Sequence, residues 1–206
     1  MKRFEYYSTE SNGHLSEYLA WYRKRPEEIA NWINLDAWIH GETGGYLRTT
    51  IEERDWFEEY FDTILEEPAR NYDGSDRGLE HCSYIIEALE TGRVYRGHFN
   101  VMNGKTISNL PEESVVEVPC YVDGNGISVP RVGDLPLGPA AVCSQSIWVQ
   151  KLAVEAAVNG DELLLKQAAM MDPLTGAVCN PPEIWQMIDE LLVAQKEWLP
   201  QYEQAI

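Results

Sequence analysis

The sequence predicts an α+β fold, mostly helical with a small antiparallel sheet, in one domain that spans residues 1–206. Three observations lead to this prediction. Apolar residues recur at helical spacing toward both ends of the chain, short β-rich runs occupy the middle, and no repeat, low-complexity segment or linker divides the sequence. A hydrophobic content of 44%, with 11% aromatic residues, is enough for a packed core and argues against wholesale disorder.

The first third of the chain is predicted to form two helical stretches. Residues 14–39 form a helix that is broken near Pro26, with an apolar face made by Trp21, Ile29, Trp32 and Ile33. The acidic segment 51–67 is also helical and carries a stripe of Trp56, Phe57, Tyr60, Phe61 and Ile64. A polar loop is expected over residues 68–78.

The sheet is predicted in the middle of the chain. Asn103 and Gly104 stand between two short strand-like runs, which predicts a tight hairpin at that pair. A second hairpin is expected around residues 123–126, where the neighbouring Pro119 and Pro130 push the strands toward sheet edges or irregular pairing.

Further helices are predicted before and after this sheet. The first covers residues 79–91 and ends at Gly92, a residue type that often terminates helices. The others cover roughly 140–159, 161–171 and 182–197. The last begins beside Pro181, where proline is tolerated, and its apolar face consists of Ile184, Ile188, Leu191 and Leu192.

The charge of the chain is strongly negative. Sixteen Lys and Arg residues against thirty-four Asp and Glu residues give a net charge of −18. Such a surface repels phosphate backbones, which argues against nucleic acid or an anionic membrane as the main partner. No stretch approaches the roughly 20 apolar residues of a membrane span, and the N-terminus has no apolar signal core. We therefore expect a cytoplasmic protein. Its negative charge is compatible with a neutral substrate such as a sugar and also suits a site that binds a divalent cation.

Several common functional motifs are missing from the sequence. It contains no GxGxxG after a strand and no Walker loop, so it offers no recognisable nucleotide-phosphate cradle. No nucleophile elbow is present either. Its four cysteines form no CxxC pair, which predicts free thiols rather than disulfides or a structural zinc site: Cys82, Cys120, Cys143 and Cys179.

His14 is the first candidate functional residue. It lies in the first turn of a predicted helix, after short polar residues, where it faces a metal or a substrate. The plain structural alternative is a polar first-turn residue, with Glu17 available as a capping-box partner. The residues themselves leave both interpretations open.

His81 and Arg77 are the next candidates. A neutral imidazole near neutral pH is well suited to accept a proton, although a helix histidine often only bonds a backbone carbonyl. Arg77 suits a hydroxyl or carboxylate ligand, or else forms a surface ion pair with Asp73 or Asp76. The turn residues His98 and Asn109 either line a cleft or satisfy the backbone, and His40 is expected to end a helix.

Several stretches, taken together, resemble one known family. They run in order through nearly the whole chain: "STESNGHLSEYLAWYRKR" (8–25), "EHCSYIIEALETG" (80–92), "ISNLPEESVVEVPCYVDGNGISVPRVGDLP" (107–136), "LAVEAAVNGD" (152–161), "QAAMMDPLT" (167–175) and "IWQMIDELLVAQKEWLPQY" (184–202). These stretches look like the C-terminal half of glycoside hydrolase family 4, on its α-galactosidase and α-glucosidase side, with a fold like the C-terminal domain of lactate dehydrogenase-like enzymes.

The resemblance implies an unusual route to glycoside hydrolysis, one that differs from the two-carboxylate mechanism. NAD oxidises the sugar at C3, which acidifies the proton at C2. A divalent metal, usually manganese, polarises the ketone, a base removes that proton, and the aglycone leaves by elimination. Water then adds, and the cofactor returns its hydride.

The resemblance also implies roles for particular residues. His14 matches the family's metal-binding histidine, and Arg77 matches an arginine that contacts substrate. Asn12, in the same segment as His14, and Asn109 are further expected substrate contacts. The position of His81 often carries tyrosine, the proposed base, so here the base is His81 itself or one of two loop carboxylates, Asp73 and Asp76.

The family's dinucleotide-binding domain and the cysteine of its metal site lie upstream of the position of His14. The resemblance therefore implies that this chain is the substrate- and metal-binding half of an α-glycosidase, inactive until a separate chain supplies the NAD-binding half. The alternative is a non-catalytic domain that acts in oligomerisation or sugar binding. A homo-oligomer is expected in either case, because an uncovered apolar surface promotes association.

Overall fold

The computed structural model describes residues 3–7, 12–22, 24–25, 27, 31, 50–52, 56–68, 77–78 and 80–202. The chain forms two compact units, the first made of Met1–Phe57 with Ala141–Ile206 and the second of Glu58–Ala140. The expectation of a single domain stays a prediction.

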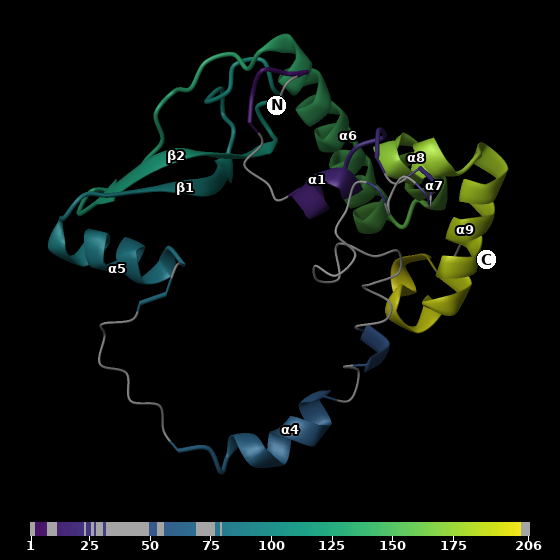
Figure 1. Ribbon diagram of the computed structural model, residues 1–206, viewed down its shortest axis with the longest axis horizontal. Helices are drawn as coiled ribbons and strands as arrows, with labels where there is room; N and C mark the ends of the chain where they lie inside the picture. Colours follow the sequence, from purple (N-terminus) through teal and green to yellow (C-terminus); the bar gives the residue numbers. More distant parts are fainter. Residues whose placement is uncertain are drawn as a thin grey trace. The chain divides into compact units, whose positions relative to one another are not determined.

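Most of the described residues are helical, and a three-stranded antiparallel sheet completes the fold (Figure 1). The expected α+β class is therefore confirmed. The elements are, in order, α1 (Asn12–Glu17), α4 (Trp56–Ile64), α5 (Cys82–Thr91), β1 (Tyr95–Met102), β2 (Val115–Asp123), β3 (Gly126–Ser128), α6 (Leu137–Asn159), α7 (Glu162–Met171), α8 (Pro173–Val178), α9 (Pro181–Ala194), and the 3-10 turns η2 (Lys196–Trp198) and η3 (Pro200–Tyr202).

The sheet forms the centre of the second unit. β1 pairs with β2 from Tyr95 opposite Val122 to Met102 opposite Val115, and β3 pairs with the end of β2. Alternate residues of β2 are buried, as expected for a strand with one face on a core: Val116, Val118, Cys120 and Val122. Helix α5 contacts both β1 and β2, so residues near the helix start can meet the first residues of β1.

The second expected hairpin is confirmed, since Asp123 pairs with Gly126 across its turn. Pro119 lies in the middle strand opposite His98, but β3 pairs only with Tyr121, Val122 and Asp123. The proline therefore stands where β2 has one neighbouring strand, which limits the cost of its missing N–H.

The tight hairpin predicted at Asn103 and Gly104 is wrong. β1 ends at Met102 and β2 begins only at Val115, so the connection runs over residues 103–114. Asn103 is fully buried in this loop, and its Oδ1 accepts a hydrogen bond from the backbone N of Ile107 at 2.7 Å. Its Nδ2 lies 3.0, 3.1 and 3.0 Å from the carbonyl oxygens of Ile107, Leu110 and Pro111. The asparagine side chain thus organises a longer loop instead of a turn.

Helices α7, α8 and α9 begin where polar side chains cap them. Asp161 accepts from the backbone N of Leu164 at 2.9 Å, and Asp172 accepts from Thr175 at 2.8 Å. Asn180 caps α9 in a reciprocal capping box with Glu183. The helices expected near 140–159, 161–171 and 182–197 are confirmed with shifted ends, and the short α8 is an addition to them.

The core of the first unit forms around α9. Ile188, Leu192 and Tyr202 are buried together, and the partly buried Leu165, Ala169, Met187 and Leu199 pack against them. Leu191, assigned to the same apolar face by its spacing, is 43% exposed. Lys166 of α7 also joins the two helices, since its Nζ lies 2.5 Å from a carboxylate oxygen of Asp189 on α9.

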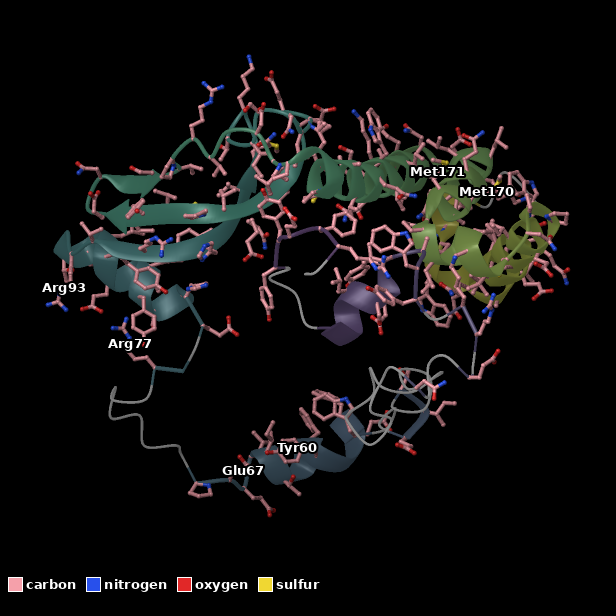
Figure 2. The ribbon with its side chains drawn as sticks, turned by 45° about the horizontal axis from the view of Figure 1, so that its top comes forward. Tyr60, Glu67, Arg77, Arg93, Met170 and Met171 are labelled. Atoms are coloured by element: carbon pink, nitrogen blue, oxygen red, sulfur yellow. The ribbon has the colours of Figure 1, made fainter. Side chains whose placement is uncertain are left out.

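The N-terminal third departs from the sequence-based expectation. α1 ends at Glu17, and residues 18–22 form turns, so the helix predicted over 14–39 does not continue there; most of its remainder lies outside the described residues. Helix α4 confirms part of the helix expected over 51–67, and the hydroxyl of Tyr60 donates to Glu67, which follows the end of the helix (Figure 2). The side chains of its aromatic stripe are 37% to 56% exposed.

None of the helices in the described ranges has the length and apolar character of a membrane span. All four cysteines are free, as expected, and only Cys120 is fully buried.

Candidate functional site

The structure describes the side chains of three predicted site residues, Arg77, His81 and Asn109, and all three belong to the second unit. Asn12 and His14 lie in α1, but their side chains are outside the described part of the chain. Asp73 and Asp76 also fall outside it. The roles of these four residues stay predictions.

Three groups on α5 hold Arg77. Its Nε donates to Oγ of Ser83 at 3.1 Å, and its Nη1 donates to Oε2 of Glu87. Ser83 and Glu87 are one helical turn apart and therefore lie on one face of α5. The guanidinium carbon also lies 4.1 Å from the ring centre of Tyr84, a cation–π contact. Arg77, which precedes α5 in the chain, is thus anchored to that helix, and the sequence-based alternative of an ion pair with a loop aspartate is not needed to hold it.

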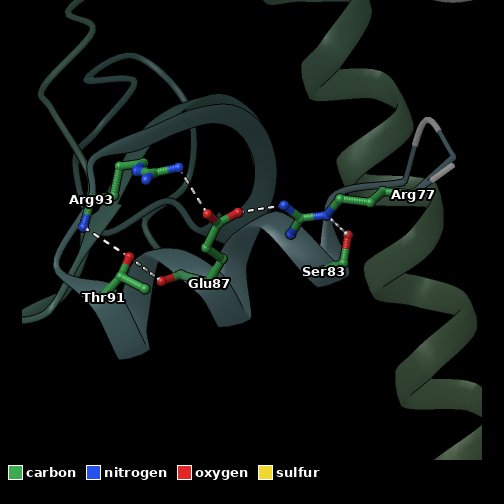
Figure 3. A network of polar contacts seen from close by, with 5 residues as sticks. All are labelled: Arg77, Ser83, Glu87, Thr91 and Arg93. Carbon is green, nitrogen blue, oxygen red and sulfur yellow. Dashed lines mark hydrogen bonds and ion pairs between the residues drawn. The ribbon is translucent and has the colours of Figure 1, made fainter. Parts of the chain in front are cut away.

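Glu87 lies between two arginines (Figure 3). While its Oε2 accepts from Arg77, its Oε1 accepts from Nη1 of Arg93 at 3.0 Å. Thr91 fixes the end of the helix, because its Oγ1 donates to the carbonyl of Glu87 at 2.6 Å and accepts from the backbone N of Arg93. Gly92 then ends α5 in the left-handed conformation, at φ 71°, as the sequence predicts. Two guanidiniums with one carboxylate leave a net positive charge at this site.

The arginines lower the pKa of Glu87. The Arg77 hydrogen bond has the largest effect, desolvation opposes it, and the charges of Arg77 and Arg93 lower the pKa further below its ordinary value of 4.5. A carboxyl group with a lowered folded pKa adds stability that is fully present above the unfolded pKa. That stability is lost as the pH falls through the folded pKa.

Glu87→Gln is therefore expected to lower the thermal unfolding midpoint at about pH 7, and the difference from wild type should shrink below the ordinary pKa of 4.5. Melting curves recorded by circular dichroism from about pH 7 to about pH 3 measure it. Glu112→Gln is the control, since Glu112 forms a 3.2 Å ion pair with Lys105 in which both side chains are more than 60% exposed. A Glu87→Gln difference that stays constant or grows on acidification would contradict the prediction.

His81 and Tyr95 are joined across α5 and β1. Nδ1 of His81 lies 2.6 Å from the hydroxyl oxygen of Tyr95. Tyr95 also stacks on Tyr84, with ring centres 5.3 Å apart and planes 14° from parallel. Because Tyr84 contacts Arg77, a continuous series of contacts links both predicted residues, Arg77 and His81.

A shallow hollow of about 280 Å³ lies beside this series. The Arg77, Glu87 and Arg93 network forms its polar side, and Tyr84, Ala88, Val94 and Tyr95 complete the lining. Aromatic rings beside anchored hydrogen-bond donors suit a ligand with both apolar faces and hydroxyl groups, as sugars have.

Asn109 holds two loop segments together. Its Nδ2 donates to the carbonyl of Leu135 at 2.8 Å, and its Oδ1 accepts from the backbone N of Leu135 at 2.9 Å. Each group keeps a second hydrogen or lone pair for another partner. His98 is exposed on β1, and His40 is outside the described residues.

A metal centre needs several side-chain ligands held together. Within the described ranges, no group of three or more His, Cys, Asp or Glu residues could hold a metal ion. The donor atoms of these ranges thus do not, by themselves, fit a manganese ion.

Sequence reasoning missed five residues of the polar and aromatic contacts at this site: Ser83, Tyr84, Glu87, Arg93 and Tyr95. The spacing of Ser83 and Glu87 in the predicted helix was a usable signal, because residues four apart share a helix face. Tyr95 gave no such signal. Its contact with His81 depends on how α5 packs against the sheet.

The sequence also matches a family of known proteins. Residues 1–175 match the family 4 glycosyl hydrolase C-terminal domain, and the chain belongs to this family. The family resemblance seen in the sequence is thereby confirmed.

Two bacterial α-galactosidases are similar to this chain. One, from Rhizobium meliloti (strain 1021), is 57% identical over 206 residues, which are 100% of this chain and 42% of that protein. The other, from Bacillus subtilis (strain 168), is 35% identical over 202 residues, 98% of this chain and 45% of that protein. The chain spans less than half the length of either relative.

Two crystal structures of a 6-phospho-alpha-glucosidase from gut microorganisms share the fold. The one in complex with NAD and glucose-6-phosphate is 22% identical, covers 85% of this chain and 38% of that chain, and has a TM-score of 0.61. The one in complex with NAD and Mn2+ is 19% identical, covers 81% and 35%, and has a TM-score of 0.55. At these identities the likeness shows the fold alone.

Proposed function

We propose that this chain is the substrate- and metal-binding half of an NAD- and manganese-dependent α-glycosidase, of α-galactosidase or α-glucosidase type. The observation that carries the proposal is the 57% identity to an α-galactosidase over the full length of this chain. The anchored Arg77, the His81–Tyr95 pair and the adjacent hollow supply the matching chemistry.

Arg77 binds the sugar in this proposal. A guanidinium has five N–H donors, and the contacts with Ser83 and Glu87 use only part of them. Because Ser83, Glu87 and the Tyr84 ring hold the group in place, little side-chain entropy remains to be lost when a sugar hydroxyl binds. Asn12 and Asn109 are additional substrate contacts, and the remaining hydrogen and lone pair of the Asn109 amide suit a hydroxyl.

The proton at C2 of the sugar is removed by one of three residues, His81, Asp73 or Asp76. NAD supplies hydride transfer at C3 when it is bound, and manganese supplies charge stabilisation. His14 is one ligand of that metal, and residues outside this sequence supply the other ligands and the NAD site. The structure with NAD and Mn2+ supports these cofactors for the family fold.

The second candidate function is a non-catalytic domain that acts in oligomerisation or sugar binding. Exposed apolar side chains on α7 and α9 and in η2 favour association: Leu163 is 58%, Val193 is 66% and Trp198 is 72% exposed. Homo-oligomerisation fits both functions and therefore does not distinguish them. Sugar binding that depends on manganese distinguishes them, because only the glycosidase half is expected to show it.

Arg77→Ala is expected to weaken binding of methyl α-galactopyranoside by at least about tenfold, because a charged hydrogen-bond donor to the sugar is lost. Calorimetric titration of the purified chain, with and without Mn2+, measures the affinity. Arg93→Ala is the matched control. Arg93 contacts the same carboxylate, Glu87, and also lines the hollow, but its side chain is 77% exposed and is not held by Ser83 and Tyr84. We therefore expect a change of less than about threefold.

The same titration tests His14. Because His14 by itself binds a metal weakly, Mn2+ is added in large excess, and His14→Ala should abolish the gain in sugar affinity that Mn2+ then causes, without changing the affinity measured in its absence. If Arg77→Ala and Arg93→Ala weaken binding equally, the role of Arg77 is wrong. If Mn2+ does not change the sugar affinity of either wild type or His14→Ala, the result would favour the non-catalytic sugar-binding domain.

A further inference from the structure

His81 sits at the N-cap position of α5, and Tyr95 is the first residue of β1. At this position a polar side chain often accepts a hydrogen bond from the helix backbone, but His81 makes no such bond. Its Nδ1 instead lies 2.6 Å from the Tyr95 hydroxyl oxygen. The imidazole of His81 is therefore hydrogen-bonded to the side chain of Tyr95 and not to the backbone of α5.

Aromatic rings contact both side chains, although His81 itself is exposed. Tyr95 stacks on Tyr84, and its backbone pairs with the fully buried Val122. The His81 ring meets the Phe99 ring edge to face, with centres 5.4 Å apart and an interplanar angle of 72°. Gly97 leaves room for this arrangement, since a Cβ there would lie 2.5 Å from a Phe99 ring carbon and 3.3 Å from Nδ1 of His81. The pair is thus held by the helix, the strand and the aromatic rings.

The direction of the hydrogen bond decides what His81 can do. A neutral imidazole has one N–H donor and one bare acceptor nitrogen, whereas a tyrosine hydroxyl can act in either role. If Tyr95 donates to Nδ1, the proton of the imidazole is on Nε2, which then faces a ligand as a donor. If Tyr95 accepts from Nδ1, the bare Nε2 is a proton acceptor.

The chemistry of the two groups favours tyrosine as the donor. At 2.6 Å the two atoms are hydrogen-bonded, and the tautomer of the imidazole decides which of them donates. The lone pair of an imidazole nitrogen is a stronger acceptor than those of a phenol oxygen, and a phenol O–H is a stronger donor than an imidazole N–H. Within the described part of the chain, moreover, the Tyr95 hydroxyl has His81 as its hydrogen-bond partner and Nε2 has none.

We propose that Tyr95 is a positioning residue that fixes the tautomer of His81. Its hydroxyl donates to Nδ1, and Nε2–H is kept as a donor for an oxygen atom of the bound sugar. This inference rests on the proposed function and assigns a role within it. His81 hydrogen-bonds the sugar, and of the three candidates for the C2 base it leaves Asp73 and Asp76.

The test is a long-range 1H–15N correlation spectrum of the full chain with labelled histidine, recorded at neutral pH without sugar, metal or NAD. Wild type is expected to show a protonated Nε2 and a bare Nδ1. In Tyr95→Phe both nitrogens should move toward the averaged shifts of two exchanging tautomers. Tyr84→Phe is the matched control, because it removes a hydroxyl from the neighbouring stacked ring; its His81 signals should resemble those of wild type.

A proton on Nδ1 in wild type would overturn the proposal, and so would a Tyr95→Phe spectrum identical to that of wild type. Circular dichroism of each variant verifies that it folds. Because no ligand is present, either result is independent of whether the chain binds galactosides, which the titration of Arg77→Ala measures.

Sugar binding adds a second readout for the donor role. His81→Gln keeps an N–H donor and should bind methyl α-galactopyranoside within about threefold of wild type, whereas His81→Ala should lose about tenfold. Equal losses in the two variants would contradict the donor role of His81.

Discussion

Asn103→Ala is expected to lower the free energy of unfolding by about 2–4 kcal/mol, since each buried polar group left without a partner costs about 1–3 kcal/mol. The alanine would leave the backbone N of Ile107 without its acceptor. It would also remove the donor to the carbonyl groups of Leu110 and Pro111. The loop over residues 103–114 should lose its order first.

Urea denaturation followed by circular dichroism measures this loss, and hydrogen exchange of the loop locates it. Tryptophan fluorescence is not suited to the task, because all seven tryptophans lie outside residues 58–140. Asn100→Ala is the matched control, since Asn100 is exposed on β1, and it should change stability by less than about 0.5 kcal/mol. A loss below about 1 kcal/mol for Asn103→Ala would mean that the loop does not depend on this side chain.

Ile188→Ala is expected to cost about 2–4 kcal/mol, because it removes buried methyl and methylene groups and leaves a cavity. Ile188 is 8% exposed and packs with Leu192 and Tyr202. Fluorescence of Trp185 and Trp198, which are close to it in sequence, makes urea denaturation a direct readout for this unit.

Leu191→Ala provides the comparison for Ile188→Ala. It removes a side chain of similar size from the same helix, but Leu191 is 43% exposed, so a loss of less than about 1.5 kcal/mol is expected. Equal losses for the two variants would show that the apolar face of α9 is buried more evenly than the structure indicates.

The helices were the most predictable part of the fold. Gly92 ends α5, and the capping box of Asn180 with Glu183 begins α9, each through hydrogen bonds between residues close in sequence. Such signals are local, so they can be recognised without knowledge of the tertiary structure. The spacing of Ile184 and Ile188 likewise predicted which face of α9 is buried.

The loop at Asn103 shows where local signals fail. An asparagine before a glycine is typical of a two-residue hairpin turn. The same side chain can instead be buried and bind carbonyl groups four to eight residues further along, as it does in this chain. Which outcome is more stable depends on whether residues 103–114 can close around the amide, and strand propensity does not report that.

The candidate site likewise has features that the sequence predicts and features that depend on tertiary packing. Sequence by itself determined the class of fold, the helix limits near Gly92 and Pro181, the family, and the choice of Arg77 and His81 as candidates. Only the tertiary structure decided that Glu87 lies between Arg77 and Arg93, and that the Tyr95 hydroxyl meets His81. The physical reason is that the Tyr95–His81 contact forms only when α5 packs against the sheet. A contact between two elements does not produce a recognisable spacing of residues in the sequence of either one.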